Sequence, residues 1–176
     1  MIVETGHYAL VLAGALALAQ SWGGLWGPWR GSVRQMALAD SAALGQAAFA
    51  TLAFAALVAA HVTSDFSVAN VASNSHSTKP LLYKITGAWG NHEGSMAFWI
   101  LIMALFGSAV AVFGGNLPDD LRARALGIQG LIGLGFIAFV LFTSNPFWRM
   151  DPPPMDGRGL NPLLQDPGLA FHPPFL

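Results

Sequence analysis

The sequence predicts an all-α membrane protein with about four transmembrane helices, a long outer loop and a proline-rich outer tail. Of its 176 residues, 54% are hydrophobic and only 10% are charged. Soluble domains carry about a quarter charged residues, and a soluble core of this size could not bury so much apolar surface. Lipid is therefore the expected solvent. The apolar runs lack the alternation of a half-buried strand, which leaves helices as the spanning elements.

Four apolar stretches approach the ~20 residues that a helix needs to cross a bilayer. They predict a four-helix transmembrane region over residues 1–143, with spans at about 8–26, 41–62, 95–115 and 125–143. The first span is expected to close at a cluster of small and helix-breaking residues, namely Gly23, Gly24, Gly27 and Pro28. In the last span, glycines are expected to allow close packing against a neighbouring helix: Gly127, Gly130, Gly133 and Gly135.

The N-terminal apolar run could be mistaken for a signal peptide. It carries Glu4 and neither Lys nor Arg before the run, whereas a signal peptide needs positive charge there. A retained first helix is the preferred interpretation.

Orientation follows from the positions of Lys and Arg. Arg30, Arg34, Arg122 and Arg124 lie in the short first and third loops, whereas Lys79, Lys84, Arg149 and Arg158 lie in the two long segments. Each side holds four Lys or Arg residues, so only their higher density in the short loops decides the orientation. It places those loops inside, and the N-terminus, the loop at 63–93 and the tail at 144–176 outside.

Composition excludes several function classes. A net charge of −1 gives no clustered basic surface, so no nucleic-acid partner is expected. The absence of cysteine excludes disulfides and thiolate sites within this chain. Gln46 and Gln129 are taken as the only strongly polar residues inside the spans, which argues against a transporter with ionisable groups at the midplane.

The two outer segments hold most of the polar information. The loop has 31 residues and the tail 33, and eight of the eleven prolines lie in the tail, which predicts an extended, pre-shaped strap on the membrane surface. The tail ends on Phe175-Leu176, which has the character of the start of a further span. The chain is therefore expected to be a fragment or one piece of a split subunit.

Four strings in these segments are specific: Trp89–Ser95 (WGNHEGS), Ser144–Phe147 (SNPF), Leu160–Gly168 (LNPLLQDPG) and His172–Pro174 (HPP). Together they resemble the N-terminal portion of CcmF-type cytochrome c maturation proteins, the membrane subunit of a heme lyase. The resemblance covers nearly the whole chain, beginning at Glu4.

The resemblance implies a part in positioning heme for covalent attachment to the CxxCH thiols of apocytochrome c. It implies b-type heme as the delivered substrate, and a second, structural heme only in the full-length protein. Implied partners are a holo heme chaperone, apocytochrome c with its thiol-reducing chaperone subunit, the rest of the subunit, and the lipid bilayer. The implied location is the bacterial inner membrane, or the mitochondrial inner membrane in an organelle, with the long loops periplasmic.

Several residues carry these expectations, and no catalytic residue is assigned. By position, His172 matches a histidine that ligates heme iron in the family; from sequence alone it would be an interfacial histidine. Arg158 is expected to pair with a heme propionate. Trp148 could contact the flat macrocycle or anchor the interface. With Glu93, His92 forms either a proton-handling pair at the heme entrance or a plain helix N-terminus.

Two alternatives remain open. The chain could be a structural or transporter-like membrane subunit with no heme chemistry of its own. Because this chain offers a single candidate iron ligand, it is expected to be inactive alone. Asp65, with Ser64 and Ser67, is interpreted as a turn or helix cap. His7 is interpreted as an interfacial anchor of the first span, and His61 and His76 receive no role.

Overall fold

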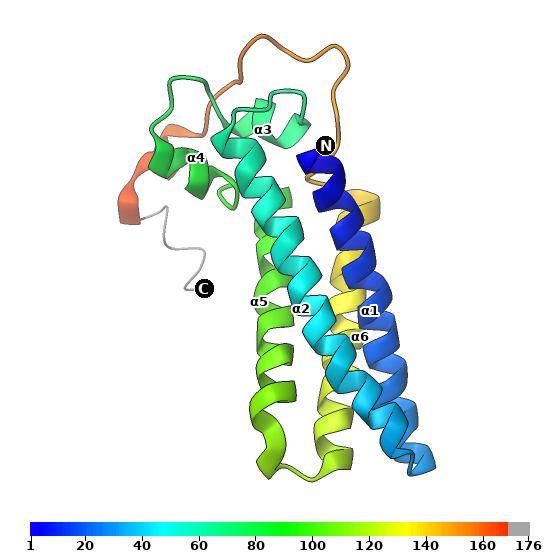
Figure 1. Ribbon diagram of the computed structural model, residues 1–176. Coiled ribbons are helices and arrows are strands. Elements are labelled where there is room, and N and C mark those ends of the chain that lie inside the picture. Colours follow the sequence, from blue (N-terminus) through cyan, green and yellow to red (C-terminus); the bar gives the residue numbers. More distant parts are fainter. Residues whose placement is uncertain (169–176) are drawn as a thin grey trace.

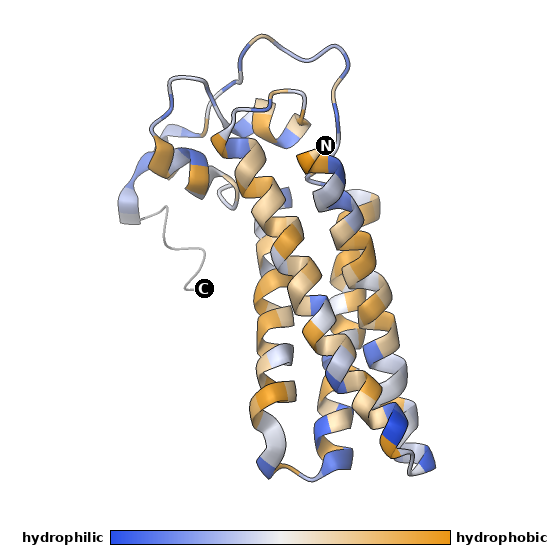
Figure 2. Ribbon diagram, viewed as in Figure 1, coloured by the Kyte–Doolittle hydropathy of each residue, from blue (hydrophilic) through white to orange (hydrophobic). Residues whose placement is uncertain are grey.

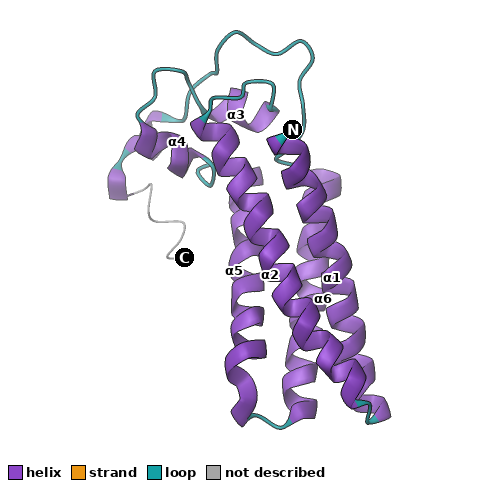
Figure 3. Ribbon diagram, in the orientation of Figure 1, coloured by secondary structure: helices purple, strands orange, loops and turns teal. Residues whose placement is uncertain are grey.

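Four long helices form the body of the protein in a computed structural model that describes residues 1–168 (Figures 1 and 3). They are α1 (Ile2–Arg30), α2 (Val33–Val62), α5 (His92–Phe113) and α6 (Asp119–Thr143). Each is long and apolar enough to cross a membrane, counting with α5 the short 3-10 helix η1 (Gly114–Asn116) that extends it. Apolar residues dominate along the bundle, and polar residues gather at its two ends (Figure 2). The predicted all-α membrane fold with four spans is confirmed.

The helices are longer than the apolar runs suggested. The first starts at Ile2 and continues through Pro28 to Arg30, and the second starts at Val33. The prediction that glycines close the first span is wrong. A Cβ on Gly23 would lie 2.7 Å from the carbonyl oxygen of Gln35, so this glycine lets α2 approach α1 instead of ending the helix. The actual end is Gly31, with φ of 64° in the left-handed region that favours glycine.

Glycines also bring α6 against its neighbours. A Cβ on Gly127 would lie 2.9 Å from the carbonyl carbon of Gly24, one on Gly130 would lie 3.0 Å from the carbonyl oxygen of Ala17, and one on Gly133 would lie 2.8 Å from the side-chain nitrogen of Gln46. Three of the four predicted packing glycines therefore sit at helix contacts. Gly135 does not, because a Cβ there would meet no atom within 4 Å.

A buried amide network joins three helices inside the bundle. The Gln20 side chain is fully buried and donates to the carbonyl oxygen of Leu126 at 2.8 Å and to the side-chain oxygen of Gln129. Gln129 in turn donates to the carbonyl oxygen of Met103 at 2.9 Å. Hydrogen bonds between spanning helices stabilise their association in lipid. The statement that only Gln46 and Gln129 are polar inside the spans is thus wrong, because Gln20 is the centre of this network.

Two short helices and the tail form a cap over one end of the bundle. The helices are α3 (Ala69–Asn74) and α4 (Leu81–Gly87), both within the long loop, and the tail crosses the loop (Figure 1). The tail itself includes a 3-10 turn, η2 (Pro162–Gln165).

Backbone hydrogen bonds fix the tail to the loop at two points. At the first, the Ala69 amide donates to the Trp148 carbonyl and the Met150 amide to the Ser67 carbonyl, both at 2.8 Å. The second point lies eight residues after Met150, where the Arg158 amide donates to the Ala72 carbonyl at 2.8 Å. These bonds pair the tail with a segment some eighty residues earlier in the chain.

Candidate functional site

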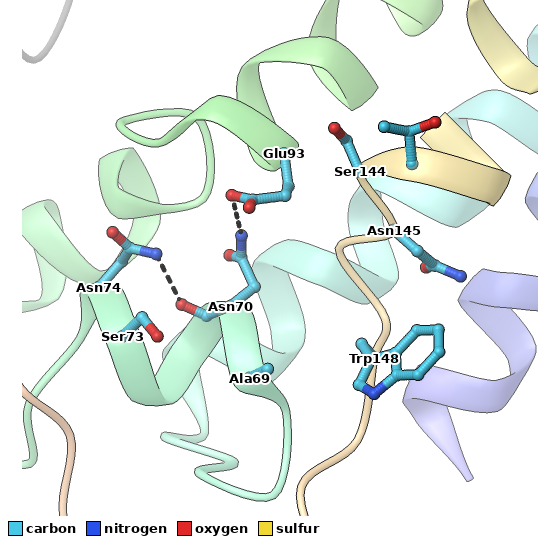
Figure 4. Close-up of a pocket in the computed structure, with 9 residues that line it drawn as sticks. Ala69, Asn70, Ser73, Asn74, Glu93, Ser144, Asn145 and Trp148 are labelled. Carbon is cyan, nitrogen blue, oxygen red and sulfur yellow. Dashed lines mark hydrogen bonds between the residues drawn. The ribbon is translucent and has the colours of Figure 1, made fainter. Parts of the chain in front are cut away.

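A polar pocket opens where the cap meets the bundle (Figure 4). Its volume is about 250 Å³, and it lies between α3, the start of α5, the end of α6 and the first residues of the tail. Its polar and aromatic lining residues include Asn70, Asn74, Glu93, Ser144, Asn145 and Trp148. Residues from four separate segments of the chain therefore meet at this pocket.

Asparagines organise the floor of the pocket and the start of α5. Asn91 is the N-cap of this helix, with its side-chain oxygen accepting from the Gly94 amide at 2.8 Å. Asn70 donates to the same oxygen at 2.6 Å and to the Glu93 carboxylate at 3.4 Å. The carboxylate lies in the first turn of the helix, where the macrodipole favours negative charge. Asparagine is a preferred N-cap, so the cap was open to prediction from sequence; the partnership with Asn70 was not.

His92 is the first residue of α5 and is exposed. Its Nε2 lies 3.2 Å from the Ser144 hydroxyl, and its ring meets the Phe139 ring edge-on with centroids 6.4 Å apart. The helix-terminus interpretation of His92 and Glu93 agrees with this geometry. Proton handling by the pair stays a prediction.

Trp148 stands between two cavities. Its side chain is 68% exposed, and it lines both the polar pocket and a second cavity of about 390 Å³ against the start of α1, where His7, Tyr8 and Arg149 also lie. The indole therefore offers an accessible flat surface at the edge of the cap. The hydrogen bond to its carbonyl fixes the backbone beneath it.

Arg149 clamps three distant parts of the chain together. It contacts Glu4 at 2.6 Å and Asp65 at 3.3 Å, and also donates to the Ser67 hydroxyl. The hydrogen bond with Glu4 is the main cause that raises the pKa of the guanidinium. The Asp65 carboxylate also accepts from the Ser67 amide at 3.2 Å, as expected for the predicted turn.

A second set of side-chain contacts, the Asp156 latch, holds the distal part of the tail. Asp156 accepts from the amide and the hydroxyl of Ser77 at 2.9 and 2.6 Å, and the His76 ring lies 3.4 Å away. These hydrogen bonds, led by that of the Ser77 hydroxyl, lower the pKa of Asp156. The carboxylate therefore stays ionised, and the latch stays closed, at neutral pH.

The structure separates the predicted site residues into two groups. His92 and Trp148 lie at or beside the polar pocket, whereas Arg158 lies in a smaller cavity of about 120 Å³ with Asp156 and Met150. The two cavities share Ser73 of α3, so they are neighbours. His172 lies outside the described residues. Within residues 1–168, no three His, Asp or Glu side chains group as a metal site.

Sequence reasoning missed a buried cation beneath the cap. The Lys79 side chain is 8% exposed, and its ammonium donates to the carbonyl oxygen of Asn74 at 3.0 Å. Within the described residues, no carboxylate lies within ion-pair distance of the Lys79 ammonium. Burial, with a smaller contribution from the charge of Lys84, lowers the pKa of Lys79 to about 8. Its neighbour His61 is fully buried at the end of α2.

Replacing Lys79 by methionine should stabilise the protein near neutral pH. Because the pKa of this base is depressed to about 8 on folding, the unfolded chain holds more protons between that pH and the ordinary value of 10.5. The free energy of unfolding of the native protein therefore rises with pH across this window. At pH 7 the Lys79 ammonium is charged in the folded state, so its full desolvation penalty applies. We expect Lys79→Met to raise Tm at pH 7 by about 2–4 °C, the shift that roughly 1 kcal/mol produces at this chain length.

Thermal unfolding of the purified protein in detergent at pH 7 and pH 10 provides the measurement. The gain should shrink at the higher pH. Lys84→Met is the matched control, since Lys84 is only half-buried and bonds the Ser64 hydroxyl at 2.7 Å. A lower Tm for Lys79→Met at pH 7 would show that the hydrogen bond to Asn74 outweighs the desolvation.

Comparisons with known proteins identify a family and relatives that this chain resembles. The family model described as cytochrome C assembly protein matches residues 89–176. A cytochrome c-type biogenesis protein of Rhodobacter capsulatus is 61% identical over 176 residues, covering the whole chain and 27% of the relative. The cytochrome c-type biogenesis protein CcmF of Pseudomonas aeruginosa is 51% identical over 177 residues, again covering 27% of the relative.

A solved structure agrees with the sequence comparisons. The structure of a cytochrome c heme lyase CcmF matches with a TM-score of 0.77 and 25% identity, covering 84% of this chain and 25% of that one. The chain thus spans about a quarter of the length of the relatives it matches.

Proposed function

This chain belongs to the cytochrome c assembly protein family and corresponds to the N-terminal portion of its CcmF-type members, and from that premise we propose that it forms part of a membrane heme lyase subunit. In this role it helps to position heme beside the CxxCH thiols of an apocytochrome. The reactivity belongs to the heme and the thiols, while the protein supplies binding and orientation.

The observation that carries the proposal is the cap. Two backbone contacts, the Arg149 clamp and the Asp156 latch hold the tail over the end of the bundle. The chain that forms this cap has high identity to cytochrome c-type biogenesis proteins. The stretch 148–159, held at both of its ends, loses little further entropy when it binds, which favours a presenting surface over a plain linker.

Heme as substrate fits the face of the cap better than its interior. The polar pocket, at about 250 Å³, lies below the usual ~300–1,000 Å³ of small-molecule pockets. Trp148 offers an exposed aromatic face for a flat macrocycle. Arg158 is exposed on the neighbouring cavity, where its guanidinium would pair with a propionate. His172 would supply an imidazole ligand to the iron.

The proposed location is the bacterial inner membrane with the cap on the periplasmic side. Two arginines lie in the helix ends beside each short connection, a higher density than in the two long segments, and positive charge favours the cytoplasmic side. The proposed partners are a holo heme chaperone, an apocytochrome c with its thiol-reducing chaperone subunit, and the remainder of the heme lyase subunit. The alternative is a scaffold without heme chemistry.

His172→Ala tests the proposal. Introduced into the native gene, this change is expected to abolish covalent c-type cytochrome, because one axial imidazole to the working heme is lost. The measurement is heme staining of membrane and periplasmic proteins, with an immunoblot to show that the variant still reaches the membrane. Met155→Ala, in the same tail and fully exposed, should retain the signal.

Two outcomes would count against this assignment. An undiminished c-type signal in His172→Ala would remove His172 as the working ligand. An undiminished signal after deletion of the whole gene would refute the heme lyase role and leave the scaffold interpretation in its place.

A further inference from the structure

The end of the bundle away from the cap carries an open groove that none of the features above uses. Its volume is about 620 Å³, and it runs between α1 and the first turns of α2. Its lining includes Trp22, Ser32, Arg34, Gln35, Leu38 and Ser41. The two helices touch closely beside the groove. A Cβ on Gly23 would lie 3.2 Å from the backbone nitrogen of Ala39.

The groove contains a free positive charge. Within residues 1–168, no carboxylate lies within ion-pair distance of Arg34, which is exposed. Of the other arginines at this end, Arg122 pairs with Asp40 at 3.1 Å and the guanidinium of Arg30 lies 5.3 Å from the ring of Trp26. Arg124 is exposed, as Arg34 is, but it does not line the groove. An available guanidinium with hydroxyls beside it is the chemistry that binds phosphate oxygens.

Polar and apolar groups are separated along the groove. Ser32 and Arg34 lie at the helix start, whereas Leu38 and Trp22 lie deeper in the spanning segments and are 39% and 51% exposed. Gln35 lines the groove between these two ends, where a side-chain amide can bond a hydroxylated headgroup. A ligand that matches this order needs an anionic, hydroxylated head and an apolar body.

The groove lies at the level expected for the lipid–water boundary. Trp26 and Trp29 are exposed at the same end of α1, and tryptophan is enriched where spanning helices meet headgroups. Basic pockets between spanning helices on the cytoplasmic side are a recurrent site for anionic lipid headgroups. A soluble phosphate ion would use the guanidinium but leave the apolar half of the groove without a partner.

We propose that this groove is a binding site for an anionic phospholipid. The phosphate lies against Arg34 and Ser32, the headgroup hydroxyls reach Gln35, and the first part of an acyl chain packs on Trp22 and Leu38. This site does not depend on the heme lyase proposal, since it lies at the opposite end of the bundle, but its likeness to cytoplasmic lipid sites rests on the proposed orientation.

Native mass spectrometry of the purified chain, with dioleoyl phosphatidylglycerol or dioleoyl phosphatidylcholine added, measures the preference directly. The unchanged protein should bind the anionic lipid more tightly, and Arg34→Gln should weaken that binding about fivefold, the effect of one arginine near a charged surface. Arg124→Gln is the matched control. It removes an exposed arginine from the same end of the bundle without touching the groove, and should leave binding unchanged.

A second measurement tests the apolar half. Phosphatidylglycerol with brominated acyl chains, added at stoichiometric amounts in detergent, should quench part of the tryptophan emission, and Trp22→Phe should remove that part. Equal binding of both lipids, or equal losses in Arg34→Gln and Arg124→Gln, would overturn the site. Displacement of the lipid by millimolar inorganic phosphate, with no quenching of Trp22, would assign the groove to a free anion and overturn the phospholipid.

Discussion

Replacing Gly24 by alanine is expected to remove most of the folded protein from the membrane. The added Cβ would overlap the carbonyl oxygen of Ala123 and lie 2.6 Å from the backbone nitrogen and Cα of Gly127. All three atoms belong to the backbone of α6, so no side chain can rotate to make room. The two helices must separate, which also strains the hydrogen bond from Gln20 to Leu126. Overpacking costs about 1–3 kcal/mol, and more where the backbone cannot yield.

Gly135→Ala is the matched control for this prediction. It adds the same methyl group to α6 at a position where no atom lies within 4 Å. Alanine is favoured over glycine in a helix by about 1 kcal/mol, so this variant should be as stable as the native protein or slightly more so. Membrane yield and thermal unfolding by circular dichroism in detergent give the comparison. Equal melting temperatures for the two variants would contradict the close contact between α1 and α6.

Gly157→Ala is expected to release the tail from the cap while leaving the bundle intact. A Cβ at this position would overlap the carbonyl oxygen of Ser75 and lie 2.9 Å from the Phe66 ring. The same carbonyl accepts from the Gly159 amide at 3.0 Å, and the Arg158 amide donates nearby to Ala72. Moving Gly157 away breaks both bonds and displaces the adjacent Asp156, whose hydrogen bonds with Ser77 are the other distal contact of the tail.

Limited trypsin digestion measures that release, because Arg158 lies at the contact that opens, whereas Arg149 stays bound to Glu4 and Asp65. Cleavage after Arg158 should accelerate by about tenfold, the effect of roughly 1.4 kcal/mol on the opening equilibrium. The unfolding temperature of the bundle should not change. Met155→Ala, fully exposed in the same segment, should be cut at the native rate. Equal cleavage rates for the two variants would show that the tail does not depend on this contact. If the cap presents heme, Gly157→Ala should also lower c-type cytochrome.

Much of the fold could be predicted because lipid imposes one simple requirement on the sequence. Apolar runs of sufficient length identify the four spans, and the fold class follows. Helix ends were harder, because the helices continue through polar residues beyond the apolar runs: α1 begins at Ile2, before Glu4, and α2 begins at Val33, before Arg34. Glycine has two opposite uses, and only the structure shows that Gly23 serves packing while Gly31 ends the helix.

The candidate site was predictable only where the signal is local. The helix start at His92 and the turn at Asp65 each depend on residues a few positions apart. The contact of Asn70 with Glu93 joins residues in different helices, and no local pattern encodes it. The same holds for Lys79, whose burial depends on how the cap folds over the end of α2.

The clamp at Arg149 sets an order for the assembly of the protein during synthesis. Glu4 and Arg149 are separated by 145 positions, with all four spans between them. At about 5–20 residues per second, the ribosome needs roughly 7–30 s to make Arg149 after Glu4. During that interval the start of α1 has no partner on the tail, and the ion pair can close only when all four helices have been inserted with both ends on the same side. The clamp therefore reports correct insertion, and a chain with one span inverted could not form it.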